Sequence, residues 1–169
     1  MAENKDLVTR NFEDEEDEDT QKDKYLTFSL GDEEYGIEIQ YVIEVIGLQK
    51  ITHIPDMPDF VKGVINLRGQ VIPVMDVRTR FKMPIKEHDD RTCVIVVNIQ
   101  DTSIGLVVDE VSEVMDIPAE RVEDPPRINQ RDSRRLIQGL GKVNDEVKIL
   151  LDVHKLLYED ELAQLSGSL

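Results

Sequence analysis

The sequence predicts an all-β protein built from two similar halves. Short apolar segments rich in valine and isoleucine are separated by Gly, Pro, Asp and Asn at intervals of about ten residues, which is typical of small barrels and sandwiches. Aromatic residues make up only 5% of the chain and there is no Trp, so the core must consist mostly of Val, Ile and Leu. The β-branched residues among them favour strands.

The third observation behind this fold class is an internal repeat. Residues 28–46 match residues 97–115, and residues 62–77 match residues 138–153, with apolar positions in the same order. We infer a duplicated unit of about 70 residues. One such unit would bury little apolar surface alone, so we expect the halves to pack together and fold as one unit. The matched glycines and aspartates are Gly36 with Gly105, Gly63 with Gly139, and Asp76 with Asp152.

Each half is expected to form five short strands. Residues 25–30 alternate in polarity, and Gly31-Asp32 then turns the chain into the next strand. Arg68-Gly69 forms the tip of a tight hairpin, and Pro73 indicates an edge position or a bulge. The expected strands are 25–30, 34–39, 42–48, 63–67 and 71–77 in an approximate subdomain 25–90, and 93–99, 104–108, 111–117, 139–143 and 147–153 in an approximate subdomain 91–157.

Two kinds of segment are expected at the ends of these strands and of the chain. Asp76 and Asp152 precede helix-capable stretches, so each can cap the following turn. Leucines and a valine at spacings near three, four and five predict an amphipathic C-terminal helix over residues 153–165, which should cover one of the two halves. Residues 1–24 hold ten acidic and four basic residues, which predicts a disordered acidic tail rather than a site for a divalent cation or a basic partner.

The charge balance restricts the partners. A net charge of −16 and a pI near 4.5 oppose binding to nucleic acid or to an anionic membrane. The lone Cys93 excludes an internal disulfide and a multi-cysteine zinc site. The N-terminus has no signal-peptide core, and no apolar run approaches membrane-spanning length. A soluble cytoplasmic protein fits these observations.

No motif predicts an active site, a metal or a cofactor. His53, His88 and His154 are scattered, without neighbouring ligands at metal-site spacing. Cys93 begins an apolar strand, which favours a packed thiol over a nucleophile. The GLG at 139–141 precedes a strand rather than a helix, which argues against a phosphate-binding loop. An enzyme would need polar groups that converge between the two halves, so the sequence predicts a protein that is not an enzyme.

Four segments carry a family resemblance: FSLGDEEYGIEI, FVKGVINLRGQVIPVMDVRTRF, VIVVNIQDTSIGLVVDEVSEVMDI and GLGKV with ILLDVHKLL. Together they resemble the CheW family, the coupling proteins of bacterial chemotaxis, over about residues 25–165. The resemblance implies two five-stranded SH3-like barrels that share a core. It implies an adaptor without catalysis, which couples the cytoplasmic tips of helical chemoreceptors to the regulatory domain of the chemotaxis histidine kinase, and which these partners recruit to membrane receptor arrays.

The resemblance also implies a receptor-binding groove between the barrels. Gly63 suits a place where a side chain would block close approach. Arg68 can donate paired hydrogen bonds to receptor carboxylates or carbonyls, or it can stabilise the groove from within. The second half has Asn144 at the position that matches Arg68, so the fold does not require arginine there, and a partner role is favoured over a merely solvated arginine. The implied receptor-binding residues are Val42, Gly63, Arg68, Cys93 and Val114.

For the kinase contact, the resemblance implies Glu44, Val45 and Ile46 in the first half and Ile128 in the second. Val45 and Ile46 are adjacent, so one of them is expected to point to the core. Ile128 lies in residues 121–135, a loop that is otherwise expected to be solvated. The alternative reading is a related adaptor of another receptor-kinase array, serving pilus motility or second-messenger signalling, and the sequence leaves this alternative open.

Overall fold

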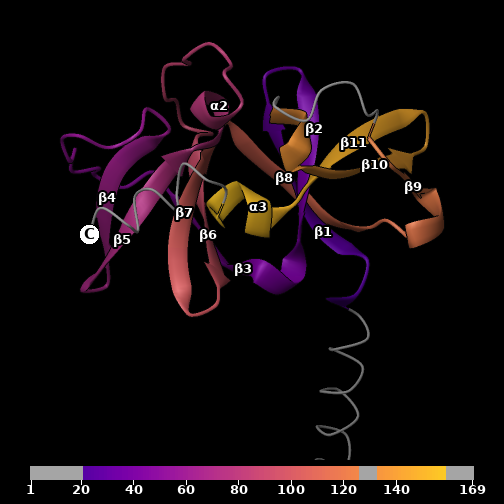
Figure 1. The fold of residues 1–169 in the computed structure, drawn as a ribbon, viewed down its shortest axis with the longest axis horizontal. Coiled ribbons are helices and arrows are strands. Elements are labelled where there is room, and N and C mark those ends of the chain that lie inside the picture. The colour runs from indigo at the N-terminus through magenta and orange to yellow at the C-terminus, as the bar shows by residue number, and fades with distance from the viewer. Residues whose placement is uncertain (1–20, 126–132, 159–169) are drawn as a thin grey trace, which may run out of the picture.

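The computed structural model describes residues 21–125 and 133–158, which form two β lobes with short helices between and beside them (Figure 1). The predicted all-β class with two SH3-like barrels is confirmed. The elements are β1 (Lys24–Leu30), β2 (Glu33–Glu38), η1 (Ile39–Tyr41), β3 (Val42–Gly47), β4 (Val61–Leu67), β5 (Gln70–Asp76), α2 (Val77–Arg80), β6 (Cys93–Ile99), β7 (Thr102–Val108), β8 (Glu110–Asp116), η2 (Ala119–Arg121), β9 (Val122–Glu123), η3 (Ser133–Leu136), β10 (Ile137–Val143), β11 (Glu146–Leu151) and α3 (Val153–Tyr158).

The strands form two sheets, and each sheet belongs to one barrel. Barrel A contains the six-stranded sheet with the order β8-β1-β2-β11-β10-β9, and barrel B contains the five-stranded sheet with the order β3-β6-β7-β5-β4. The sixth strand of barrel A is β9, which has two residues. In Figure 1, barrel B lies on the left and barrel A on the right.

The two barrels do not follow the two halves of the sequence. The hairpin β1–β2 pairs with strands of the second half, and the hairpin β6–β7 pairs with strands of the first. Parallel contacts make both joins, between β2 and β11 and between β7 and β5. Each half therefore gives its first hairpin to the barrel of the other half. The subdivision into 25–90 and 91–157 describes the repeat in sequence, whereas each barrel draws strands from both ranges.

The repeat itself is reproduced strand by strand. The bounds of β1 and β6 differ by 69 residues at both ends, and those of β4 and β10 differ by 76. The hairpin tips match too, because Arg68 has a φ of 51° and Asn144 a φ of 57°. Asp76 accepts a hydrogen bond from the backbone N–H of Arg78, and Asp152 accepts one from that of Lys155, which confirms both predicted caps.

The buried apolar side chains form three clusters. The largest contains residues of both barrels, including Phe28, Ile37, Ile95 and Leu106, which are fully buried. Smaller clusters fill barrel B and barrel A. The helix α3 contributes to the central cluster, and Figure 1 shows this helix between the two lobes. We expected this helix to cover one half, whereas it packs into the core that both barrels share.

The ends of the described chain differ slightly from the expected ones. Strand β1 begins at Lys24, one residue inside the range expected for the tail, and the rest of that range up to residue 20 lies outside the described residues. Helix α3 begins at Val153, as expected, and the part of the predicted helix from residue 159 onward lies outside them as well.

Candidate docking surface

Strand β3 lies at the edge of the sheet of barrel B and presents an apolar outer face. Its side chains alternate between half-buried and exposed. Ile43 is 53% exposed and Val45 is 42% exposed, whereas Ile46 packs against the core of barrel B. The structure thus decides which of the two adjacent residues faces solvent: it is Val45.

Arg68 and Glu44, predicted for two different partners, form an ion pair in this structure. The tip of the β4–β5 hairpin carries Arg68, and the side chain of Asn66 accepts a hydrogen bond from the backbone N–H of Gly69 there. The Arg68 side chain remains 70% exposed in the pair, so it stays available to a ligand. Because both residues share one contact, a partner that engages Arg68 also changes the surroundings of Glu44.

The backbone of a neighbouring segment requires glycine at position 63. Gly63 has a φ of +151°, and a Cβ atom there would lie 2.1 Å from the backbone oxygen of Thr52. Thr52 and Val64 exchange two backbone hydrogen bonds of 2.8 and 2.9 Å, which bring the segment after β3 against β4. The close approach that we expected at Gly63 therefore comes from Thr52 of the same chain.

Cys93 and Val114 lie on opposite sides of the junction between the barrels. Cys93 begins β6 in barrel B, and both Cys93 and Val111 on β8 pack against the central cluster. Burial raises the pKa of Cys93, the charge of Glu110 raises it further, and the backbone of Val111 opposes both. A raised pKa keeps the thiol protonated, in keeping with a packed side chain. Val114 lies on β8, the edge strand of barrel A, and is 50% exposed.

The predicted groove residues do not form a single contiguous strip. Val42 and Cys93 are both partly buried and both pack against the central cluster. In the pairing of β3 with β6, however, Val42 lies opposite Val97 and Cys93 lies opposite Gly47. The two sites are therefore five residues apart along β3, roughly 16 Å at the usual rise of a strand. The interior of the junction is filled by the protein's own core, and its margin is what remains accessible.

Four exposed large apolar side chains of the described residues were not predicted as site residues: Ile43, Val71, Ile85 and Val147. Ile43 alternates with Val45 on the outer face of β3, a spacing that could have revealed it. Val71, next to the Arg68 hairpin tip, is the other exposed large apolar side chain in this region, and its repeat equivalent Val147 is exposed as well. Ile128 lies outside the described residues.

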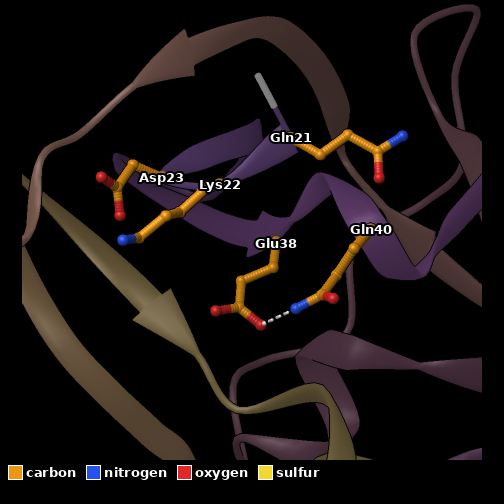
Figure 2. A pocket seen from close by; sticks show the side chains of 5 residues that line it. All are labelled: Gln21, Lys22, Asp23, Glu38 and Gln40. Carbon is orange, nitrogen blue, oxygen red and sulfur yellow. Dashed lines mark hydrogen bonds between the residues drawn. The ribbon is translucent and has the colours of Figure 1, made fainter. Parts of the chain in front are cut away.

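A hollow near the start of β1 is polar. It has a volume of about 420 Å³ and lies between the residues before β1 and the end of β2. Figure 2 shows the side chain of Gln40 directed at that of Glu38, to which its amide donates a hydrogen bond of 3.1 Å. The lining of this hollow has no apolar wall that could receive a helix. The residues that line it are Gln21, Lys22, Asp23, Glu38 and Gln40.

Within the ranges 21–125 and 133–158, no group of three or more His, Cys, Asp or Glu side chains is arranged to hold a metal ion. None of the helices in the same ranges combines the length and the hydropathy needed to cross a bilayer.

This combination of two barrels with exchanged hairpins and an apolar edge defines a binding module, and the comparisons identify its family. Residues 24–161 match the CheW-like domain. The chain is 40% identical over 140 residues to a chemotaxis protein CheW of Klebsiella aerogenes, with 83% of this chain and 84% of the relative covered. It is 31% identical over 146 residues to that of Treponema pallidum, with 84% and 86% covered.

A solved structure agrees with these sequence comparisons. The crystal structure of the scaffolding protein TtCheW from Thermoanaerobacter tengcongensis superposes with a TM-score of 0.74 at 36% identity, covering 82% of this chain and 90% of the other. The chain belongs to the CheW family.

Proposed function

We propose that this protein is an adaptor of bacterial chemotaxis, which couples the cytoplasmic helical tips of chemoreceptors to the regulatory domain of the chemotaxis histidine kinase. Family membership over nearly all described residues is the observation that carries the proposal. The relatives are named as chemotaxis proteins, and the solved structure as a scaffolding protein. In this role the protein acts by binding and has no reaction of its own.

The receptor is proposed to dock at the margin of the shared core. Val42 and Cys93 supply apolar contact there, and Val114 extends the apolar surface onto barrel A. A receptor helix laid along this margin would bury apolar side chains in the manner of helix-in-groove recognition. Arg68 lies on the hairpin of barrel B, where its exposed guanidinium can pair with a receptor carboxylate.

The kinase domain is proposed to dock on the edge of β3. Val45 and Ile43 present its apolar surface, and the unpaired edge of a sheet can accept a further strand. Ile46 supports this face from the core side. Glu44 lies between the two surfaces and pairs with Arg68, so the kinase contact and the receptor contact are adjacent.

Binding of the full chain to receptor-containing membranes and to the isolated kinase regulatory domain tests the proposal. Arg68→Glu should weaken receptor binding at least several-fold, because it puts two carboxylates face to face and removes the cation. Val45→Asp should weaken kinase binding instead, because it places a charge in an apolar contact.

The double variant Arg68→Glu with Glu44→Arg is the matched control, since it restores an ion pair with reversed polarity. If receptor binding returns in the double variant, Arg68 acts through the pair; if it stays weak, Arg68 contacts the receptor directly. A wild-type protein that binds neither partner, while its circular dichroism shows a folded β protein, would refute the proposed function. Capture of a different receptor array's kinase would favour the alternative system.

A further inference from the structure

The chain crosses from barrel B to barrel A at a single residue, Asp109. This residue lies between the end of β7 at Val108 and the start of β8 at Glu110. Strand β7 belongs to barrel B, whereas β8 is the edge strand of barrel A. The position of β8 relative to barrel B therefore depends on the direction of the chain at Asp109 as well as on the pairing of β8 with β1.

A largely buried set of hydrogen bonds holds the side chain of Asp109. The guanidinium of Arg78 donates from Nε to Oδ1 at 2.7 Å and from Nη2 to Oδ2 at 2.6 Å. The backbone N–H of Gly31 donates to Oδ2 at 2.8 Å, and Nη1 of Arg78 donates to the oxygen of Pro84 at 2.9 Å. Only 13% of the Arg78 side chain and 11% of the Asp109 side chain are exposed. A two-pronged pair of this kind fixes both distance and orientation.

These bonds join parts of both barrels. Arg78 belongs to α2, which directly follows β5 of barrel B, and Gly31 lies in the turn between β1 and β2 of barrel A. The backbone of Asp109 also donates to the oxygen of Ser29 on β1 at 3.2 Å. Asp109 is thus tied to both barrels at the point where the chain passes between them.

The repeat has a second crossing, with a neutral residue at the position of Asp109. There the chain passes from β2 in barrel A to β3 in barrel B through η1, and Gln40 occupies the position that matches Asp109. Gln40 carries no charge, and its amide donates to Glu38 at the edge of the open hollow in Figure 2. The second crossing therefore has no carboxylate at the position of Asp109, so a carboxylate at this position is not a requirement of the crossing itself.

The predicted receptor contacts lie on either side of the Asp109 crossing. Cys93 pairs with Val108, immediately before Asp109, and both Cys93 and Val111, two residues after Asp109, pack against the central cluster. Val114 follows three residues later on the same strand. A rotation of β8 at Asp109 would change the separation between Cys93 on barrel B and Val114 on barrel A.

We propose that Arg78 and Asp109 are positioning residues of the receptor-docking surface: their buried pair sets the direction of β8 and so the spacing of Cys93 and Val114. This inference rests on the proposed function for its partner. Neither residue needs to touch the receptor, since both act through the strand that carries its contacts.

The test compares the full-length wild type with Asp109→Asn, which keeps the shape of the side chain but removes its charge. Affinity for a helical receptor-tip fragment and for the kinase regulatory domain is measured by calorimetry. Asp109→Asn should weaken receptor binding by about tenfold, the range expected when a residue away from the ligand shifts a binding surface. Kinase binding through β3 should change less than about twofold. Arg78→Lys, which keeps the charge but loses the fork, should give an intermediate loss.

Leu150→Ala is the matched control for stability, because Leu150 is fully buried in the core of barrel A and distant in sequence from the crossing. Variants are compared at temperatures equally far below their melting points. If Leu150→Ala weakens receptor binding as much as Asp109→Asn, or if Asp109→Asn weakens both partners equally, the pair is merely structural and the proposal is overturned. Unchanged receptor binding in Asp109→Asn overturns it as well.

Amide chemical shifts of the free protein provide a readout that needs no partner. Asp109→Asn should shift the signals of Cys93, Val111 and Val114 and leave Val45 unchanged, whereas unmoved signals along β8 would overturn the proposal. If the wild type fails to bind the receptor fragment, the proposed function fails, and this measurement still decides whether the pair sets the position of β8.

Discussion

Barrel A and barrel B share one backbone layout but have different interiors. In barrel B, Ile65 lies opposite Ile72, and both are buried in an apolar cluster. At the matching positions of barrel A, Gly141 lies opposite Lys148. Space left by the glycine is taken up by Ile117, whose side chain would lie 3.0 Å from an added Cβ atom. The same strand pair thus encloses two isoleucines in one barrel and a glycine with a lysine in the other.

Lys148 is buried in barrel A because two carboxylates receive its ammonium group. It donates to Glu34 on β2 and, at 2.8 Å, to Glu146 on its own strand. Burial alone lowers the pKa of Lys148, but the hydrogen bonds and charges of Glu146 and Glu34 outweigh it and the pKa is raised. The same position of the strand pair can therefore hold either a packed apolar side chain or a charged side chain with partners. A buried charge without a partner would destabilise the barrel.

The largest effect is expected when the lysine is placed in the barrel that lacks these partners. Ile72→Lys should destabilise the protein by about 4 kcal/mol, because it buries an ammonium group without a carboxylate. The positions that match Glu146 and Glu34 hold Gln70 and Ser103, which are neutral. Urea unfolding followed by circular dichroism measures the loss.

A second variant sharpens this comparison of the barrels. Adding Gln70→Glu and Ser103→Glu to Ile72→Lys rebuilds the charged group of barrel A inside barrel B and should recover part of the lost stability. If the triple variant is no more stable than the single one, the interiors are not interchangeable and the contrast has another cause.

The matching glycines Gly63 and Gly139 offer the second test. Gly63→Ala should cost about 3 kcal/mol, since it combines a positive φ with a clash against the backbone of Thr52. Gly139→Ala should cost about 1 to 2 kcal/mol, because its added Cβ atom would first meet a side-chain methyl of Val122, which can move.

Gly47→Ala serves as the control for both glycine variants, as nothing lies within 4 Å of an added Cβ atom there. It should change the free energy of unfolding by less than about 0.5 kcal/mol. Equal losses for Gly63→Ala and Gly139→Ala would show that backbone crowding does not distinguish the two barrels.

The succession of strands along each half was predictable from the sequence. Gly36 with Gly105 and Asp76 with Asp152 fix the alignment of the repeat, and the alternation of apolar residues marks its strands. The exchange of the first hairpins was not predictable. Pairing of β2 with β11 joins residues more than a hundred positions apart, and the alternation within a hairpin is the same whichever copy it joins. A repeat contains no information about which copy its hairpin joins.

The candidate site was predictable only in part, for a related reason. Residue types and the family resemblance indicated Arg68, Val45 and Cys93, but the partner of Arg68 is on β3, 24 positions away in the sequence. Lys148 stands in a short apolar strand, where alternation alone cannot show whether its neighbours supply a carboxylate. Such contacts depend on tertiary structure, which local patterns do not describe.

The third test compares the two crossings and depends on pH. Burial raises the pKa of Asp109, but the hydrogen bonds from Arg78 and Gly31, together with the charges of Arg78 and Lys86, outweigh burial and leave it below its usual value. A lowered pKa in the folded state means that Asp109 stabilises the protein above about pH 4 and that this contribution is lost as the pH falls through the folded-state pKa.

Asp109→Asn should therefore lower the free energy of unfolding by about 2 kcal/mol at pH 7, the usual contribution of hydrogen bonds to a charged group. This loss should become smaller as the pH falls below about 4. Unfolding curves at several pH values measure the difference. Gln40→Ala at the second crossing is the control, because it removes no titratable group, and its cost should not depend on pH. A pH-independent cost of Asp109→Asn would show that its charge is not what holds the first crossing.

The smallest effect is expected at the two hairpin tips. Arg68→Ala removes an exposed ion pair and should change the stability by at most about 1 kcal/mol, since most of the arginine side chain is in solvent. Asn144→Arg in barrel A introduces an arginine at a tip with the same left-handed backbone, with Glu113 at the position that matches Glu44. It should be neutral within about 0.5 kcal/mol. Because both changes barely affect folding, receptor binding separates them: it should fall in Arg68→Ala and stay unchanged in Asn144→Arg. Equal binding by the two variants would place the receptor away from the tip of barrel B.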